Sequence, residues 1–111
     1  MYLPDILKSF IEKHGEIADA YRESGKLCSD AGPLDTKTQH LLQLGISVGS
    51  GSKGGVRSHA RRAMEAGATE GEVIHTVLLA TPIIGFPAMI AAYGWISEVL
   101  SAVESAEVNL A

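Results

Sequence analysis

Residues 56–72 read VRSHARRAMEAGATEGE and predict one helix, its end and the start of the next helix. At 100° per residue, small and apolar side chains between residues 56 and 66 fall on one side of a helix and charged side chains on the other. The apolar side consists of Val56, Ala60, Ala63 and Met64, and the charged side of Arg57, Arg61, Arg62 and Glu65. Gly67 ends this helix, and Thr69 with Glu72 forms a capping box that begins another.

Upstream, the helix that precedes this segment is predicted over residues 36 to about 48. Thr36 and Gln39 have capping-box spacing and an apolar run follows them directly. The residues between the two helices, 49–55, read GSGSKGG and predict a loop or a weak helix start.

The N-terminal region, residues 4 to about 24, carries apolar side chains at i, i+4 spacing and is predicted to be helical. Gly15 is placed to divide this region into two helices, since glycine is the usual residue just past a helix end. Residues 30–34 read DAGPL and predict a loop.

Downstream, a nearly all-apolar helix is predicted over residues 70–81, and Pro87 suits the start of a last helix reaching about residue 104. The segment 73–97 contains no Asp, Glu, Lys or Arg and is long enough to cross a bilayer. Pro82 interrupts it, so two buried helices explain it better than a membrane span. No strand-like alternation stands out, and the expected fold is an all-α bundle of about five to six helices.

The composition bounds the class of protein. A chain of 111 residues predicts a single domain, residues 1–111. With 46% apolar and 20% charged residues, it has more apolar surface than a small monomer needs, which favours self-association. The net charge of −4 argues against nucleic-acid binding. Cys28 is the single cysteine, so an internal disulfide is excluded, and the N-terminus shows no secretory signal. We expect a cytoplasmic protein.

Several segments in this order resemble the carboxymuconolactone decarboxylase / alkylhydroperoxidase D-like family. They are TKTQHLLQL at residues 36–44, SHARRAMEAGAT at residues 58–69, EVI at residues 72–74 and GFPA at residues 85–88. The resemblance covers roughly residues 34–98. It implies an all-helical protomer that assembles as a trimer or a hexamer.

The redox branch of this family keeps a Cys-x-x-Cys before a histidine and a glutamate on the preceding helix. By position, these cysteines fall on Ser52 and Gly55, the histidine on His59 and the glutamate on His40. Thiol chemistry needs a thiolate nucleophile and a resolving thiol, which Ser52 and Gly55 lack. The resemblance therefore argues against thiol peroxidase activity here. In the decarboxylase branch the same stretch can carry an acidic residue, and Gly55 supplies none.

Three residues are candidates for catalysis. His59 flanks the apolar side of its helix and could act as a general acid or base, or be a core-edge histidine bonded to backbone. His40 is expected to project from the preceding helix toward a pocket that it shares with His59. Ser52 could be a nucleophile or a helix cap. A metal site is not predicted, because zinc takes three or four protein ligands and the only further histidines are His14 and His75. No cofactor is predicted.

Two kinds of function stay open. The first is a non-thiol enzyme or binder, related to the decarboxylases, that acts on a small organic acid or carbonyl compound through histidine acid/base chemistry, which would make it a lyase. The second is a degenerate family member that serves as an oligomeric interaction module. Antioxidant activity of the peroxiredoxin type is disfavoured by the missing Cys-x-x-Cys.

Overall fold

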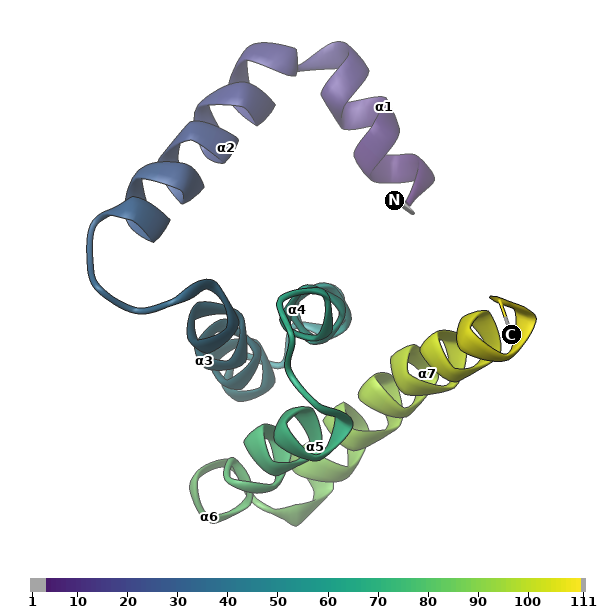
Figure 1. Ribbon diagram of the computed structural model, residues 1–111. Coiled ribbons are helices and arrows are strands. Elements are labelled where there is room, and N and C mark those ends of the chain that lie inside the picture. Colours follow the sequence, from purple (N-terminus) through teal and green to yellow (C-terminus); the bar gives the residue numbers. More distant parts are fainter. Residues whose placement is uncertain (1–3, 111) are drawn as a thin grey trace. The chain divides into compact units, whose positions relative to one another are not determined.

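The computed structural model of the protein describes residues 4–110, and these residues form helices without strands, as the sequence predicts (Figure 1). Six of the helices have nine residues or more, and α6 is a single turn. The helices are α1 (Asp5–Lys13), α2 (Gly15–Asp30), α3 (Thr36–Gly49), α4 (Lys53–Glu65), α5 (Glu70–Leu78), α6 (Thr81–Ile84) and α7 (Phe86–Leu110).

The chain divides into two compact units, one ending at Pro33 and the other beginning at Leu34. The first unit holds α1 and α2, and the predicted division into two helices is confirmed. The break lies at His14, however, and Gly15 is the first residue of α2, which runs past the predicted end near residue 24. Ala18 is the one buried side chain of these two helices, so the unit has almost no core of its own. A single domain over the whole chain stays a prediction.

The start of α3 differs from the predicted capping box. The helix cap is Asp35, whose Oδ1 accepts a hydrogen bond from the Thr38 backbone N–H at 2.8 Å. Thr36 is the first helical residue, and the Gln39 amide donates to the Leu34 carbonyl at 2.7 Å. Asp is a better cap than Thr, and it stands one position earlier, so it begins the helix. The hydrogen bonds from Thr38 lower the pKa of Asp35 below its usual value.

The capping box that begins α5 is confirmed. Thr69 Oγ1 accepts from the Glu72 N–H at 3.1 Å, and Glu72 Oε1 accepts from the Thr69 N–H at 2.9 Å. Helix α5 ends at Leu78, earlier than predicted. Proline has no N–H to donate and its ring collides with the carbonyl four residues before it, which for Pro82 is that of Leu78.

The uncharged segment 73–97 is therefore divided among α5, α6 and the first part of α7, and it is not one continuous span. Gly85, with φ +90°, ends α6 in a conformation that favours glycine. Among the described residues, the 19-residue stretch Phe86–Glu104 of α7 is long and apolar enough to cross a membrane, with a mean hydropathy of 1.3. Core helices of soluble proteins meet the same criterion, so this is weak evidence.

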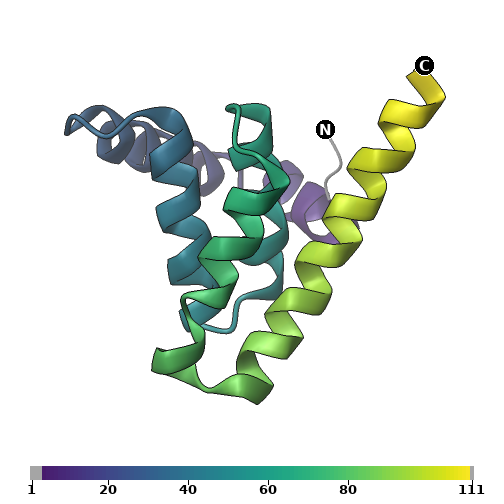
Figure 2. The same ribbon diagram turned by 60° about the horizontal axis from the view of Figure 1, so that its bottom comes forward.

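The second unit carries the hydrophobic core, and α4 packs against both α3 and α7 (Figure 1 and Figure 2). The predicted apolar side of α4 is confirmed, since Val56, Ala60 and Ala63 are fully buried. They pack with Leu44 of α3 and Ile96 of α7, which are also fully buried. This packing fixes α3 beside α4, the arrangement on which the candidate site depends.

Candidate functional site

His40 of α3 and His59 of α4 face each other across the helix pair. Their Nδ1 atoms lie 3.4 Å apart, and the ring centroids are 5.7 Å apart with the planes inclined at 30°. Both side chains are half-buried. The two histidines therefore approach each other, and the polar neighbour of His59 Nδ1 is the His40 imidazole. A pocket shared by both side chains stays a prediction, because the hollow at this site is lined by His40 and not by His59.

The surroundings favour the neutral form of both rings. Burial lowers the pKa of His59 below the ordinary value of 6.5, and Arg62 and then His40 lower it further. Burial also lowers the pKa of His40, and Arg62 adds to the effect, while a hydrogen bond with Gln43 and the charge of Glu65 act in the opposite direction. A hydrogen bond between two Nδ1 atoms needs one N–H donor and one bare nitrogen. The neutral pair would therefore hold two different tautomers, one of which presents a free basic nitrogen.

A hollow of about 450 Å³ opens beside His40. Its lining residues are Thr36, His40, Arg62, Glu65 and Ala66. Arg62 follows His59 by three residues and Thr36 precedes His40 by four, so helical geometry places each on the side of its histidine. Sequence reasoning had assigned Arg62 and Glu65 to a charged outer face. The three-residue spacing from His59 is the signal that could have placed Arg62 at the site.

Within the part of the chain that the structure describes, no group of three or more His, Cys, Asp and Glu side chains could hold a metal ion. His75 is exposed on α5, and His14 is an exposed residue at the start of α2. Cys28 is an exposed thiol near the end of α2.

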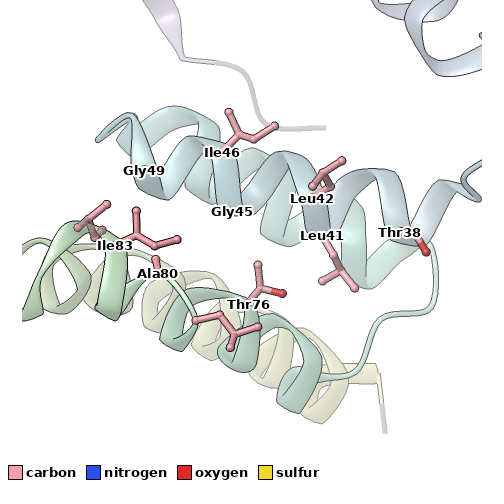
Figure 3. Close-up of a pocket in the computed structure, with 11 residues that line it drawn as sticks. Thr38, Leu41, Leu42, Gly45, Ile46, Gly49, Thr76, Ala80 and Ile83 are labelled. Atoms are coloured by element: carbon pink, nitrogen blue, oxygen red, sulfur yellow. The ribbon is translucent and has the colours of Figure 1, made fainter.

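The opposite side of α3 forms an apolar groove of about 490 Å³ with α5 and α6 (Figure 3). Its lining residues are Thr38, Leu41, Leu42, Gly45, Ile46, Gly49, Thr76, Leu79, Ala80, Ile83 and Ile84. None of them is titratable. The Thr76 hydroxyl donates to the Glu72 carbonyl at 2.9 Å, so its one proton is already used and it can only accept a hydrogen bond in the groove. This groove was not predicted from the sequence.

The sequence model of the carboxymuconolactone decarboxylase family matches residues 15–98, most of the chain. The chain belongs to this family. The fold is similar to that of a carboxymuconolactone decarboxylase family protein from Legionella pneumophila, in its apo crystal structure, with a TM-score of 0.75 and 21% identity. That match covers 86% of this chain and 85% of the other. No curated protein matches the chain.

In this carboxymuconolactone decarboxylase family member, Ser52 is the cap of α4 and accepts a hydrogen bond from the Gly55 N–H at 3.1 Å. It precedes His59 by seven residues, about 10 Å along a helix axis. Ser52 does not line the hollow beside His40 either. The structure brings His40 and His59 together without Ser52, and a catalytic part for Ser52 stays a prediction.

Gly55, where the resemblance places the second cysteine of the redox branch, packs closely against α3. A Cβ atom added there would lie 2.6 Å from Ser47 Oγ, 2.9 Å from Ser52 Oγ and 3.0 Å from Ser47 Cβ. Real Cβ contacts are essentially never below 3.0 Å, so a side chain at this position requires Ser47 to move. The site segment thus lacks the thiols, and a side chain at position 55 would first have to displace the Ser47 and Ser52 side chains.

Proposed function

We propose that this carboxymuconolactone decarboxylase family member is a non-thiol enzyme that acts on a small organic acid or carbonyl compound through the His40–His59 pair. The observation that carries the proposal is the 3.4 Å approach of the two Nδ1 atoms. Burial and Arg62, which lower both pKa values, support a free base at neutral pH. A general base must be unprotonated to accept a proton from its substrate.

The chemistry follows from the ability of the pair to take up one proton and return it. When a 3-oxo acid loses CO₂, the C–C bond breaks and its electron pair forms an enolate. The free imidazole nitrogen takes up a proton from water and passes it to the enolate carbon, and the hydroxide that is left combines with CO₂ to give bicarbonate. The same pair can remove a proton from a carbon next to a carbonyl, which gives exchange or isomerisation instead. Positioned acid/base catalysis typically contributes about 10²- to 10⁴-fold in rate.

Proton NMR in D₂O tests this proposal with acetoacetate, for decarboxylation, and with pyruvate, for exchange of its methyl protons. His59→Asn should lower either rate by about 10²-fold or more. His75→Asn is the matched control, because His75 is exposed on another helix, and should leave the rates unchanged. Equal rates in the wild type and His59→Asn would rule out the histidine mechanism.

A second candidate function, an oligomeric interaction module, is favoured by the apolar groove. Large apolar side chains along it are exposed, with Ile83 at 84% and Ile46 at 62%. Exposed apolar patches of this kind mark association sites. We propose a second copy of the chain as the occupant, because the excess of apolar residues is a property of the chain itself.

Native mass spectrometry tests self-association directly. The trimer or hexamer implied by the family resemblance should dissociate in Ile46→Glu and persist in Leu27→Glu, whose residue is equally exposed but lies on α2. A monomeric wild type would overturn the proposed self-association. An oligomer with full loss of turnover in His59→Asn would support both functions together.

A further inference from the structure

We propose that Arg62 binds the carboxylate of the ligand in the hollow beside the histidine pair, and that Glu65 restricts this hollow to monocarboxylates. The inference rests on the proposed function, since it names the ligand class of the same site. It concerns charge recognition, which neither the family assignment nor the fold specifies.

Arg62 has the position and the freedom to bind an anion. Its side chain lines the hollow together with His40, and it is exposed. Among the residues that the structure describes, Arg57 pairs with Glu98 and Arg22 with Asp19, whereas Arg62 has no carboxylate within ion-pair distance. A guanidinium presents planar paired donors that match a carboxylate, and such charge-assisted pairs are among the strongest hydrogen bonds.

The same location brings the ligand to the His40 imidazole, which lines the hollow. Arg62 lies one helical turn after His59, and its charge is felt at both His59 and His40. A carboxylate that neutralises Arg62 would leave the neighbouring carbon of the ligand near His40, which lines the same hollow. The arginine would thus orient the carbon at which the pair gains or loses a proton.

Glu65 sets the limit on ligand charge. Of the five residues that line the hollow, Arg62 is the only cation and Glu65 the only anion, apart from the titratable His40. A second carboxylate held within the hollow would lie near Glu65, and no further Arg or Lys lines the hollow to compensate it. Like charges at close range repel, so a dianion should bind more weakly than a monoanion.

One carbon skeleton in three charge states tests the proposal at pH 7.5. The probes are malonate, monomethyl malonate and dimethyl malonate, with two, one and no negative charges, titrated into the full-length protein by ¹H–¹⁵N NMR. Monomethyl malonate should bind most tightly. Arg62→Gln should weaken its binding by about 10- to 100-fold, the size expected for a charge-assisted hydrogen bond. Arg61→Gln, the adjacent arginine outside the hollow, should leave binding unchanged.

Glu65→Gln provides the opposite change at the same site. It should strengthen malonate binding and remove the preference for monomethyl malonate. Arg62→Lys keeps the charge but loses the paired donors, so it should retain part of the affinity. Because Arg62 and Glu65 are both exposed, these variants should keep the helical circular dichroism of the wild type.

Three results would overturn the proposal. They are wild-type affinity for monomethyl malonate in Arg62→Gln, binding of dimethyl malonate as tight as that of monomethyl malonate, or no binding of any probe to the wild type. The proposed catalysis fails separately, when His59→Asn retains full turnover while Arg62→Gln still loses binding. Conversely, a loss of turnover in His59→Asn with unaltered binding in Arg62→Gln would contradict only the role of the arginine.

Discussion

Two opposite sides of helix α3 differ in the chemistry of their side chains and in their packing. Toward α4 it presents His40 and Ser47 in a tight contact, where His59 and Gly55 approach from the other helix. Toward α5 and α6 it lines an open groove whose residues carry no titratable group. The difference teaches that two concavities of similar size on one helix can suit different functions: the side toward α4 carries groups that can exchange a proton, and the apolar groove carries none.

The largest expected effect concerns the coupling of the two histidines. If His40 and His59 act as one proton-sharing unit, each single change to Asn should lower turnover by about 10²- to 10⁴-fold, and the double change should cost little more. The measurement is a double-mutant cycle on the rate of acetoacetate decarboxylation. If the rate losses of the two single variants multiply in the double variant, the two histidines act independently. The control variant Gly45→Ala, in the groove, should stay near the wild-type rate.

The next effect is a change in the free energy of unfolding when a glycine on each side of α3 is replaced by alanine. Gly55→Ala should destabilise the protein by about 1 kcal/mol, because overpacking a filled contact costs about 1–3 kcal/mol and exceeds the gain of about 0.5–1 kcal/mol in helix propensity. Urea denaturation measures the change. Combining it with Ser47→Ala, which removes the closest oxygen, should restore part of the loss. An unaltered urea midpoint in Gly55→Ala would show that Ser47 moves aside without cost and that the contact between α3 and α4 is not tight at this position.

A glycine-to-alanine substitution on the groove side, Gly45→Ala, should change the free energy of unfolding in the opposite direction. A Cβ atom at Gly45 would meet Thr76 Cγ2 at 3.7 Å, an ordinary van der Waals contact. Gly45→Ala should therefore stabilise the protein by about 0.5–1 kcal/mol, the gain in helix propensity within α3. Denaturation of Gly94→Ala, in α7 with open space around the added atom, is the control and should show a similar gain. A destabilised Gly45→Ala would be the result expected if the proposed second copy of the chain packs directly against Gly45.

The smallest effect is the dependence of stability on pH. The folded pKa values of His40 and His59 lie below 6.5, so the unfolded state binds more protons as the pH falls below that value. The stabilising contribution of the neutral pair is complete above about pH 6.5 and is lost on acidification. Replacing both histidines by Gln should reduce the loss of unfolding free energy between pH 7 and 5.5. Gly45→Ala should keep the wild-type slope.

Much of the fold follows from local patterns. The apolar side of α4 and the capping box of Thr69 and Glu72 are short-range patterns that predicted the structure correctly, and Gly15 marked the break between α1 and α2 to within one residue. Asp35 shows the limit of such patterns. Asp35 and Thr36 are both good caps, and the motif alone favoured the residue with a glutamine three positions on.

The site could be predicted only in part. His40 and His59 are marked by their place in a family-like order, and the structure confirms that they meet. To predict that Arg62 lines the hollow, one would have to know which side of α4 faces it, because an arginine in a charged run is ordinarily solvated. The groove is formed by residues of α3, α5 and α6 that are far apart in the sequence. The spacing of apolar residues within one helix does not predict a concavity between several helices.

The close approach of Gly55 to Ser47 also limits how this chain can change over generations. A cysteine at position 55 alone would arrive in a space already occupied, at a cost in stability and without a partner thiol at position 52. A dithiol site here would need cysteines at both positions 52 and 55 and a shift of the Ser47 side chain, so a cysteine at position 55 alone would confer no dithiol chemistry. The packing of Ser47 against Gly55 is thus a local obstacle to acquiring the Cys-x-x-Cys that the family resemblance places at these positions.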